Sequence, residues 1–179
     1  FRSDGVIDSN DQAPIGYNPV PEMTFSLTAG LNWKGFDFSV LLQGATRSSI
    51  YLQGDIAWDN SWGNYYEEHI GRWTPETAAT ATYPRFTKAA TATHPNYYKS
   101  DYWLKDSKYL RLKNIQLGYT IPRKLLKKIG IRSLRVYTNA YNLLTWDNVK
   151  KVDPESPNNS NGQFYPQQKV INFGINLNF

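Results

Sequence analysis

The chain ends in Val170-Ile171-Asn172-Phe173-Gly174-Ile175-Asn176-Leu177-Asn178-Phe179, where two kinds of side chain alternate. Large apolar residues occupy every second position: Ile171, Phe173, Ile175, Leu177 and Phe179. Asparagine and glycine fill the positions between them. A period of two is that of a β-strand, so this strand has one apolar face and one small, polar face. Such a strand suits a wall between lipid and water, because the outer face of a soluble strand usually carries Lys, Glu or Thr.

Two earlier segments, 24–33 and 36–44, alternate in the same way and are separated only by Lys34-Gly35. This short separation predicts a hairpin with a tight turn. We place Trp33 and Phe36, which flank the turn, in an aromatic girdle at a membrane interface rather than in a binding site.

Two more strands are expected, over 109–121 and 134–144. In the first, the apolar positions change phase near Lys113-Asn114, which indicates either a β-bulge or a pair of residues at the membrane boundary. In the second, the alternation does not decide which face is apolar. Residues 122–129 between them predict about two helical turns with exposed Lys and Arg, beginning at Pro122 and ending before Gly130.

The lengths of the connections indicate a topology. Short and long connections alternate along the chain, as the short periplasmic turns and long extracellular loops of membrane barrels do. A structureless loop as long as 46–107 is unexpected in a compact soluble domain, so either it has local structure or the architecture tolerates very long loops. We therefore divide the chain into an extracellular loop (1–22), a hairpin (23–45), a long extracellular loop (46–107), a strand–turn–strand unit (108–144), an extracellular loop (145–168) and a terminal strand (169–179).

Composition supports an all-β protein and excludes several classes. The chain has 179 residues, 15% of them aromatic, with a mean hydropathy of −0.58. No apolar run approaches the roughly 18 residues of a membrane-spanning helix, and there is no cysteine for a disulfide or thiolate site. The net charge of +5 comes without a basic, aromatic-lined groove, so we expect no nucleic-acid partner.

The fold class we predict is all-β, comprising the last five or so antiparallel strands of a large transmembrane β-barrel. Five strands cannot close such a barrel, for which about eight is the minimum. The chain starts at Phe1-Arg2-Ser3 without an initiator Met, and we interpret it as an internal fragment.

A family resemblance is carried by the run 101–122, which includes Tyr109-Leu110-Arg111-Leu112-Lys113-Asn114 and Leu117-Gly118-Tyr119-Thr120-Ile121-Pro122. This stretch closely resembles one near the end of SusC/RagA-like TonB-dependent transporters. The resemblance extends to Arg72-Trp73-Thr74-Pro75-Glu76, Tyr83-Pro84-Arg85, Arg135-Val136-Tyr137, Asn142-Leu143-Leu144-Thr145-Trp146 and Asp153-Pro154-Glu155.

The resemblance implies a barrel of about 22 strands in the bacterial outer membrane, with a plug domain that precedes this chain. It implies import of oligosaccharides or peptides with energy passed through the TonB complex, and a SusD-like surface lipoprotein as partner. It also implies that Phe179 is the terminal aromatic residue that the barrel-assembly machinery recognises. No cofactor is required for this function.

Residues 4–11 resemble the second half of an EF-hand-like calcium loop. Asp4, Asp8 and Asp11 would supply oxygen ligands, and Gly5 would make the sharp turn. Arg2 departs from the pattern, and the first ligand would precede Phe1. The two interpretations are a calcium site and a solvated acidic loop.

Aromatic residues of the long loop, Trp58, Trp62, Tyr65 and Tyr66, are the candidates for substrate contact. They could stack on sugar rings or peptide side chains, or they could pack the loop against itself or a lid protein. His69 and His94 each stand alone in the sequence, and the adjacent Glu67-Glu68 does not give the separated carboxyls of a glycosidase. We find no catalytic constellation and predict that the protein is not an enzyme.

Three functions compete at this level. The first is a transporter barrel with an undecided choice of glycan or peptide as substrate. The second is a secreted β-sandwich that binds glycans through aromatic loops, which would not depend on detergent. The third, an outer-membrane barrel enzyme, would need a nucleophile and a base from outside this chain.

Overall fold

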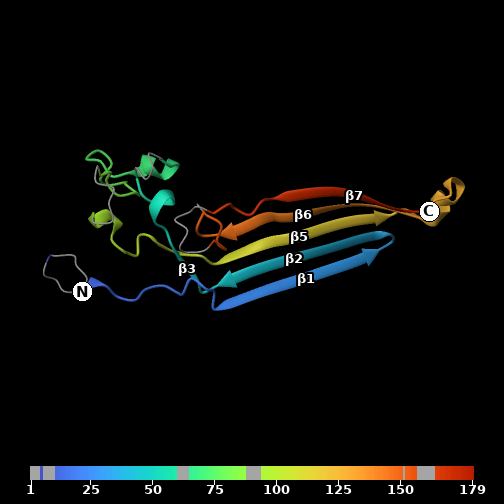
Figure 1. Cartoon of the computed structure of the whole chain (residues 1–179), viewed down its shortest axis with the longest axis horizontal. Coiled ribbons are helices and arrows are strands. Elements are labelled where there is room, and N and C mark those ends of the chain that lie inside the picture. The colour runs from blue at the N-terminus through green and yellow to red at the C-terminus, as the bar shows by residue number, and fades with distance from the viewer. Residues whose placement is uncertain (1–4, 6–10, 60–64, 88–93, 151, 157–163) are drawn as a thin grey trace.

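The computed structural model describes residues 5, 11–59, 65–87, 94–150, 152–156 and 164–179. Its main element is one antiparallel sheet in the order β1-β2-β5-β6-β7 (Figure 1). The strands are β1 (Met23–Trp33), β2 (Phe36–Thr46), β5 (Tyr109–Thr120), β6 (Ser133–Asp147) and β7 (Val170–Asn178). All five strands expected from the alternation are present, and the largest difference is the longer C-terminal end of β6.

The register of the sheet gathers the apolar positions of all five strands on one face. One cross-strand row consists of Trp33, Phe36, Tyr119, Val136 and Ile175. The next row of this face consists of Leu31, Phe38, Leu117, Thr138 and Phe173. Val136 therefore belongs to the apolar face, which the alternation within β6 could not decide. We call this surface the apolar face and the opposite one the polar face.

A register shift interrupts β5 at the predicted position. Both ladders of β5 shift next to Lys113, and Asn142 on the neighbouring strand has a left-handed φ of 51°. Because of this bulge, Leu112 pairs with Leu42 while Ile115 pairs with Val40, so residues of opposite parity share the apolar face. The bulge interpretation of the phase change is confirmed.

Two glycines on the polar face allow large side chains to lie against the sheet. Arg135 Nε donates to Asp37 Oδ1 at 2.9 Å above Gly118, whose hypothetical Cβ would collide with both side chains. In the same way, the ring of Tyr137 covers Gly174, its partner across the ladder. On the polar face, large side chains therefore lie flat against the sheet over Gly118 and Gly174. A side chain at either glycine would collide with them.

The connections separate to opposite ends of the sheet. Figure 1 shows the turn at Lys34-Gly35 and the 121–132 connection at the end where the chain finishes, with the segments that follow β2 and β6 at the other end. The 121–132 connection contains α1 (Arg123–Leu126) and η6 (Lys127–Ile129), and Gly130 closes it with a left-handed φ of 73°. The two helical turns are confirmed, although Pro122 is the N-cap and not the first helical residue.

The β-sandwich alternative does not agree with this fold. In a sandwich, one face of each strand is buried against a second sheet. Here every residue of β1 is exposed, and nearly all of β7 is exposed. In the described ranges the only other sheet is a two-stranded ribbon formed by β3 (Ser49–Tyr51) and β4 (Leu104–Asp106). Within the same ranges, no helix has the length and apolar character needed to cross a bilayer.

We predict that Gly174→Ala destabilises the full-length barrel, because the new methyl group would meet the ring of Tyr137. Overpacking of this kind costs about 1–3 kcal/mol. The measurement is the temperature at which the compact form is lost on a gel, which should fall in the variant. Adding Tyr137→Ser should restore it, and Gly30→Ala should have little effect because its Cβ would meet only Phe38 O at 3.5 Å. An unchanged melting temperature in Gly174→Ala would contradict the close approach.

Candidate functional site

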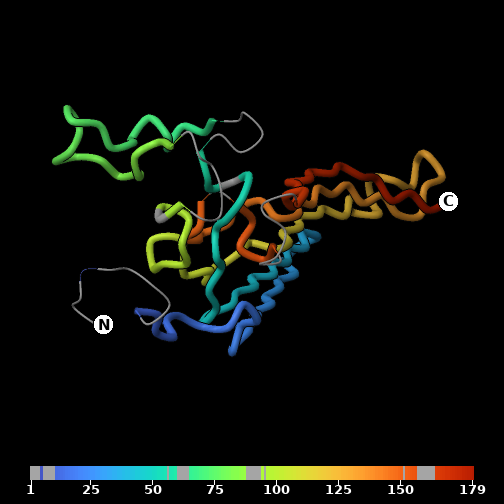
Figure 2. Tube along the Cα trace, turned by 60° about the vertical axis from the view of Figure 1, so that its left-hand side comes forward, coloured from blue at the N-terminus to red at the C-terminus, as the bar shows by residue number. Residues whose placement is uncertain are grey.

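The connection between β2 and β5 has structure of its own. Its two ends pair as β3 and β4, and the described residues between them include the 3-10 helices η2 (Gly54–Ile56), η4 (Glu67–Gly71) and η5 (Pro95–Tyr97). Of the two alternatives left open for 46–107, the described residues show local structure, in a small folded unit on two closely paired stems. Figure 2 shows segment 65–87, in green, extending away from the end of the sheet.

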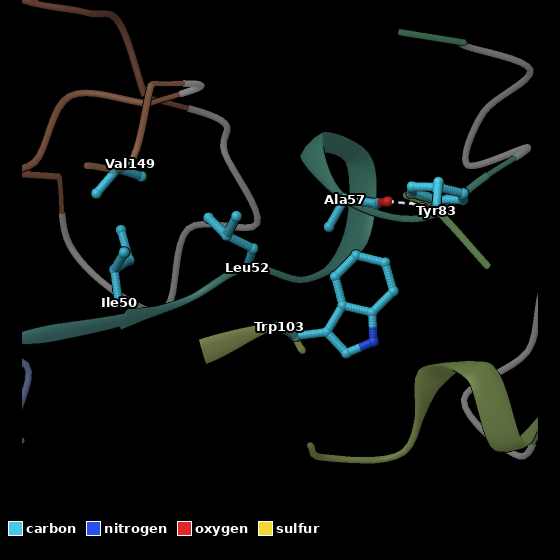
Figure 3. Packing of buried hydrophobic residues seen from close by; sticks show 6 residues of the cluster. All are labelled: Ile50, Leu52, Ala57, Tyr83, Trp103 and Val149. Carbon is cyan, nitrogen blue, oxygen red and sulfur yellow. Dashed lines mark hydrogen bonds between the residues drawn. The ribbon is translucent and has the colours of Figure 1, made fainter. Parts of the chain in front are cut away.

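A buried apolar cluster holds this unit together and joins it to the next long connection. Its buried members are Ile50, Leu52, Ala57, Tyr83, Trp103 and Val149 (Figure 3). Val149 comes from the segment after β6, while the other five come from the connection between β2 and β5. Tyr83 Oη donates to Ala57 O at 2.6 Å, and Trp103 Nε1 donates to Asn96 O at 2.9 Å, so the polar groups of both rings have partners. The two long connections therefore fold against each other.

Arg111 is the most deeply buried charged side chain among the described residues, with a relative exposure of 1%. It lies on the polar face of β5 and donates to both carboxylate oxygens of Asp153, at 2.9 and 2.8 Å. A third bond of 2.5 Å reaches Glu155, and its Nε donates to Thr145 on β6 at 3.1 Å. A buried guanidinium requires such pairing, because desolvation without a partner is very costly.

Glu155 extends this arrangement to neighbouring elements. Its carboxylate accepts from Tyr109 Oη at 2.8 Å and from Gln167 Nε2 at 2.9 Å, and Lys113 Nζ lies 3.5 Å away. The segments on both sides of 157–163 are therefore attached to the polar face of β5. We call Arg111, Asp153, Glu155 and their partners the Arg111 network. It brings together two motifs that the sequence presented only as separate parts of a family resemblance.

His69 is buried, with a relative exposure of 3%. Its Nδ1 accepts the backbone N–H of Tyr66 at 3.1 Å. Aromatic rings surround it: Tyr83 at 4.6 Å, Phe86 at 5.5 Å, Tyr66 at 5.7 Å and Tyr65 at 6.0 Å between centroids. Burial lowers the pKa of His69, so the neutral imidazole is favoured. The histidine has no paired ligand near it in the sequence, and in the fold its aromatic neighbours come from up to 17 positions away.

The four aromatic candidates for substrate contact fall into different environments. Tyr65 is 58% exposed and Tyr66 is 40% exposed, and both rings rest against His69. Trp58 packs against the apolar cluster, with its ring 4.8 Å from that of Tyr97. Trp62 lies outside the described residues. Two exposed phenol rings on a rigid base can stack on flat, weakly polar surfaces such as a sugar ring or a peptide side chain.

A buried carboxylate, that of Asp59, holds the Tyr97 ring against which Trp58 packs. Tyr97 Oη donates to Asp59, which also accepts the backbone N–H of Thr87 at 3.1 Å.

Of the proposed calcium ligands, Asp4 and Asp8 lie outside the described residues and Asp11 lies within them. Calcium binding therefore stays a prediction.

Sequence comparison finds relatives over almost the whole chain. TonB-dependent receptor P26 of Formosa agariphila is 30% identical over 99% of this chain, and TonB-dependent receptor P3 of the same organism is 28% identical over 98%. TonB-dependent receptor SusC of Bacteroides thetaiotaomicron is 25% identical over 99%. The chain spans 19%, 18% and 17% of the lengths of these three relatives. No family model matches the chain.

Solved structures have the same fold. The RagAB peptide transporter aligns over 96% of this chain with a TM-score of 0.73 and 22% identity. The RagAB peptide importer in the open-open state aligns over 97% with a TM-score of 0.71 and 24% identity. In both cases the chain covers 19% of the solved one.

The fold, its apolar face and these similarities define the chain as a segment of a TonB-dependent receptor, a class of outer-membrane β-barrel proteins. Within that class it resembles SusC in sequence and the RagAB structures in fold.

We predict that Arg111→Met releases the connection between β6 and β7. The substitution leaves two largely buried carboxylates without their cation, and breaking such a pair costs about 3–5 kcal/mol. Hydrogen exchange of residues 148–156 in the full-length protein should become faster. The matched control is Lys108→Met, because Lys108 and Asp106 form an exposed pair worth less than about 1 kcal/mol. Equal exchange in the two variants would show that the Arg111 network does not hold the connection.

We also predict that acid loosens the base of segment 65–87. The folded pKa of His69 is lowered, so its contribution to stability is complete above the ordinary value of 6.5 and decreases as the pH falls below it. The nearby carboxylate of Asp59 partly opposes this shift. The hydrogen-exchange protection of 65–72, measured against the intrinsic exchange rate at each pH, should fall between pH 7.5 and pH 5 in the wild type. The neutral acceptor in His69→Gln should remove this pH dependence, whereas His94→Gln should retain it.

Proposed function

We propose that the complete protein imports a nutrient oligomer, a glycan or a peptide, across the bacterial outer membrane. One observation carries the proposal: a continuous apolar face crosses all five strands, and a polar face with a buried charge network lies behind it. The apolar face would contact lipid, and the polar face would line the lumen through which substrate moves. The names of the relatives support a receptor for transport and not an enzyme.

The orientation we propose places the folded long connections outside the cell. Membrane barrels have long extracellular loops and short periplasmic turns, and the two kinds of connection lie at opposite ends of this sheet. Trp33, Phe36 and Tyr119 would then lie in the periplasmic aromatic girdle, where amphipathic rings are favoured. The apolar cluster and the Arg111 network would form the base of the extracellular mouth.

Substrate contact is proposed for Tyr65 and Tyr66, whose rings are exposed. Trp58 would act indirectly, by packing against the apolar cluster that holds the loop unit together. Trp62 lies outside the described residues and stays a predicted contact. The RagAB structures are described as those of a peptide importer. That description applies to RagAB and is not carried over to this protein. The substrate class of this protein is therefore left to experiment.

Two partners follow from the proposal. A SusD-like surface lipoprotein would cover the extracellular mouth, as the resemblance to SusC and RagAB suggests. The TonB complex would supply energy through a part of the protein that precedes this chain. Mass spectrometry of material that co-purifies with the tagged, detergent-solubilised protein should identify the lipoprotein.

The main experiment combines location with uptake. The full-length protein should fractionate with the outer membrane and show heat-modifiable gel mobility. Cells that express it should accumulate either labelled oligosaccharides or labelled oligopeptides, and uptake should stop when TonB is inactivated. Native protein in the detergent-free periplasm or medium would refute the barrel assignment, and TonB-independent uptake would refute the energy source.

Variants test the substrate surface. Tyr65→Ala combined with Tyr66→Ala should reduce uptake at low substrate concentration, because stacking on these rings is lost. Tyr165→Ala, which removes another exposed ring, serves as the matched control. Equal uptake by the double variant and the control would remove Tyr65 and Tyr66 from the site.

Phe179 is proposed to be the assembly signal. An unfolded barrel would present β7 as an edge with a continuous apolar stripe, which the assembly machinery could pair by β-augmentation. Phe179→Asp should lower the amount of folded protein in the outer membrane and leave the substrate preference of the inserted fraction unchanged. Normal surface levels with lost uptake would instead place Phe179 in a functional site.

A further inference from the structure

The connection between β5 and β6 is strongly basic. Residues 121–132 contain five cationic side chains: Arg123, Lys124, Lys127, Lys128 and Arg132. No aspartate or glutamate occurs between Asp106 and Asp147, so the sequence offers no local counter-charge. All five residues are exposed. Such a charge requires either solvent or an anionic partner.

The fold does not neutralise these cations. In the part of the chain that the structure describes, none of the five forms an ion pair. Asp37, on the adjacent strand β2, is already paired with Arg135 on the polar face. The other ion pairs lie toward the end of the long connections. The basic connection is thus an isolated positive surface at the opposite end of the sheet.

Apolar side chains are exposed within the same short segment. Leu125 is 70% exposed and Ile129 is 63% exposed, while Leu126 is 4% exposed. The exposed leucine and isoleucine lie among the cations, which is the composition of segments that rest in a membrane interface. Long Lys and Arg side chains suit this position, since their stems can contact acyl chains while their heads reach phosphates.

The connection lies where the apolar face ends. At this end, the rings of Phe36 and Tyr119 are 4.5 Å apart, and Lys34 Nζ lies 4.9 Å from the ring of Trp33. Figure 1 shows α1 beyond the ends of β5 and β6, at the same end of the sheet as the turn between β1 and β2. In a bilayer, aromatic rings are favoured at the edge of the hydrocarbon layer and cations are favoured beyond it, among the headgroups. The aromatic row and the basic connection follow one another in this order.

We propose that residues 121–132 bind the headgroups of anionic phospholipids in the leaflet at the short-connection end. The phosphates would contact the guanidinium and ammonium groups, and Leu125 and Ile129 would enter the acyl boundary. The exposed apolar pair favours a lipid over free phosphate, which would leave these two side chains in water. The inference rests on the proposed function in one respect, namely that the sheet spans a bilayer.

The test uses the full-length protein and native mass spectrometry, with phosphatidylglycerol and phosphatidylcholine as probes. The wild type should retain phosphatidylglycerol in preference to phosphatidylcholine. A variant with Lys124→Gln, Lys127→Gln and Lys128→Gln should retain phosphatidylglycerol at least roughly tenfold more weakly, since each cation near a membrane surface contributes about fivefold. The variant with Leu125→Ser and Ile129→Ser should also bind more weakly, with the charge intact.

The matched control carries Arg85→Gln, Lys99→Gln and Lys169→Gln, which remove three exposed cations outside the basic connection. It should bind phosphatidylglycerol as the wild type does. Equal affinity of the lysine variant and this control would overturn the proposal, as would full competition by inorganic phosphate. Heat-modifiable mobility of each variant shows that the barrel has folded. A protein that never enters a bilayer would instead refute the proposed function, so the two failures are distinguishable.

Discussion

The cross-strand register is the constraint on which the rest of the structure depends. A hydrocarbon environment leaves no water for backbone N–H and C=O groups, so every strand must pair with neighbours. Once the strands pair, each row of side chains lies on a single face, and one residue of slip would transfer the whole apolar set to the other face. The five strands satisfy this condition together, from Trp33 on β1 to Ile175 on β7.

The opposite face meets a different requirement, because it must carry polar side chains without obstructing the lumen. Near the short connections it does so with flattened side chains over Gly118 and Gly174. Near the long connections, Arg111 of β5 binds Asp153 and Glu155 and so attaches the segment that follows β6 to the sheet. At the short-connection end of the sheet, the polar side chains therefore lie flat against the backbone. At the long-connection end, the same face holds the folded loops.

The sequence was sufficient for the five strands of the main sheet because period-two alternation is a local signal, and it also located the bulge through the change of phase in β5. The three-residue strands β3 and β4 are too short to show such alternation. It was not sufficient where contacts depend on distant residues. The pairing of Arg111 with Asp153 joins positions 42 residues apart, and the rings around His69 meet only when the long connection folds. Trp58 and Tyr65 look alike as loop aromatics, yet burial separates them, and only the three-dimensional fold determines burial.

The bulge at Lys113 changes the phase of side-chain alternation within one strand. If Lys113 took a regular place in the ladder, strict alternation from Asn114 would turn Leu112 toward the lumen and Arg111 toward lipid. The Arg111 network would then lose its centre, and a guanidinium would face hydrocarbon. Lys113 is the residue that the ladder with β2 skips, because Leu41 pairs with Asn114 and Leu42 pairs with Leu112. Deleting Lys113 itself would therefore leave both faces as they are. A one-residue deletion in a regular part of β5 would instead exchange the two faces on one side of the deletion.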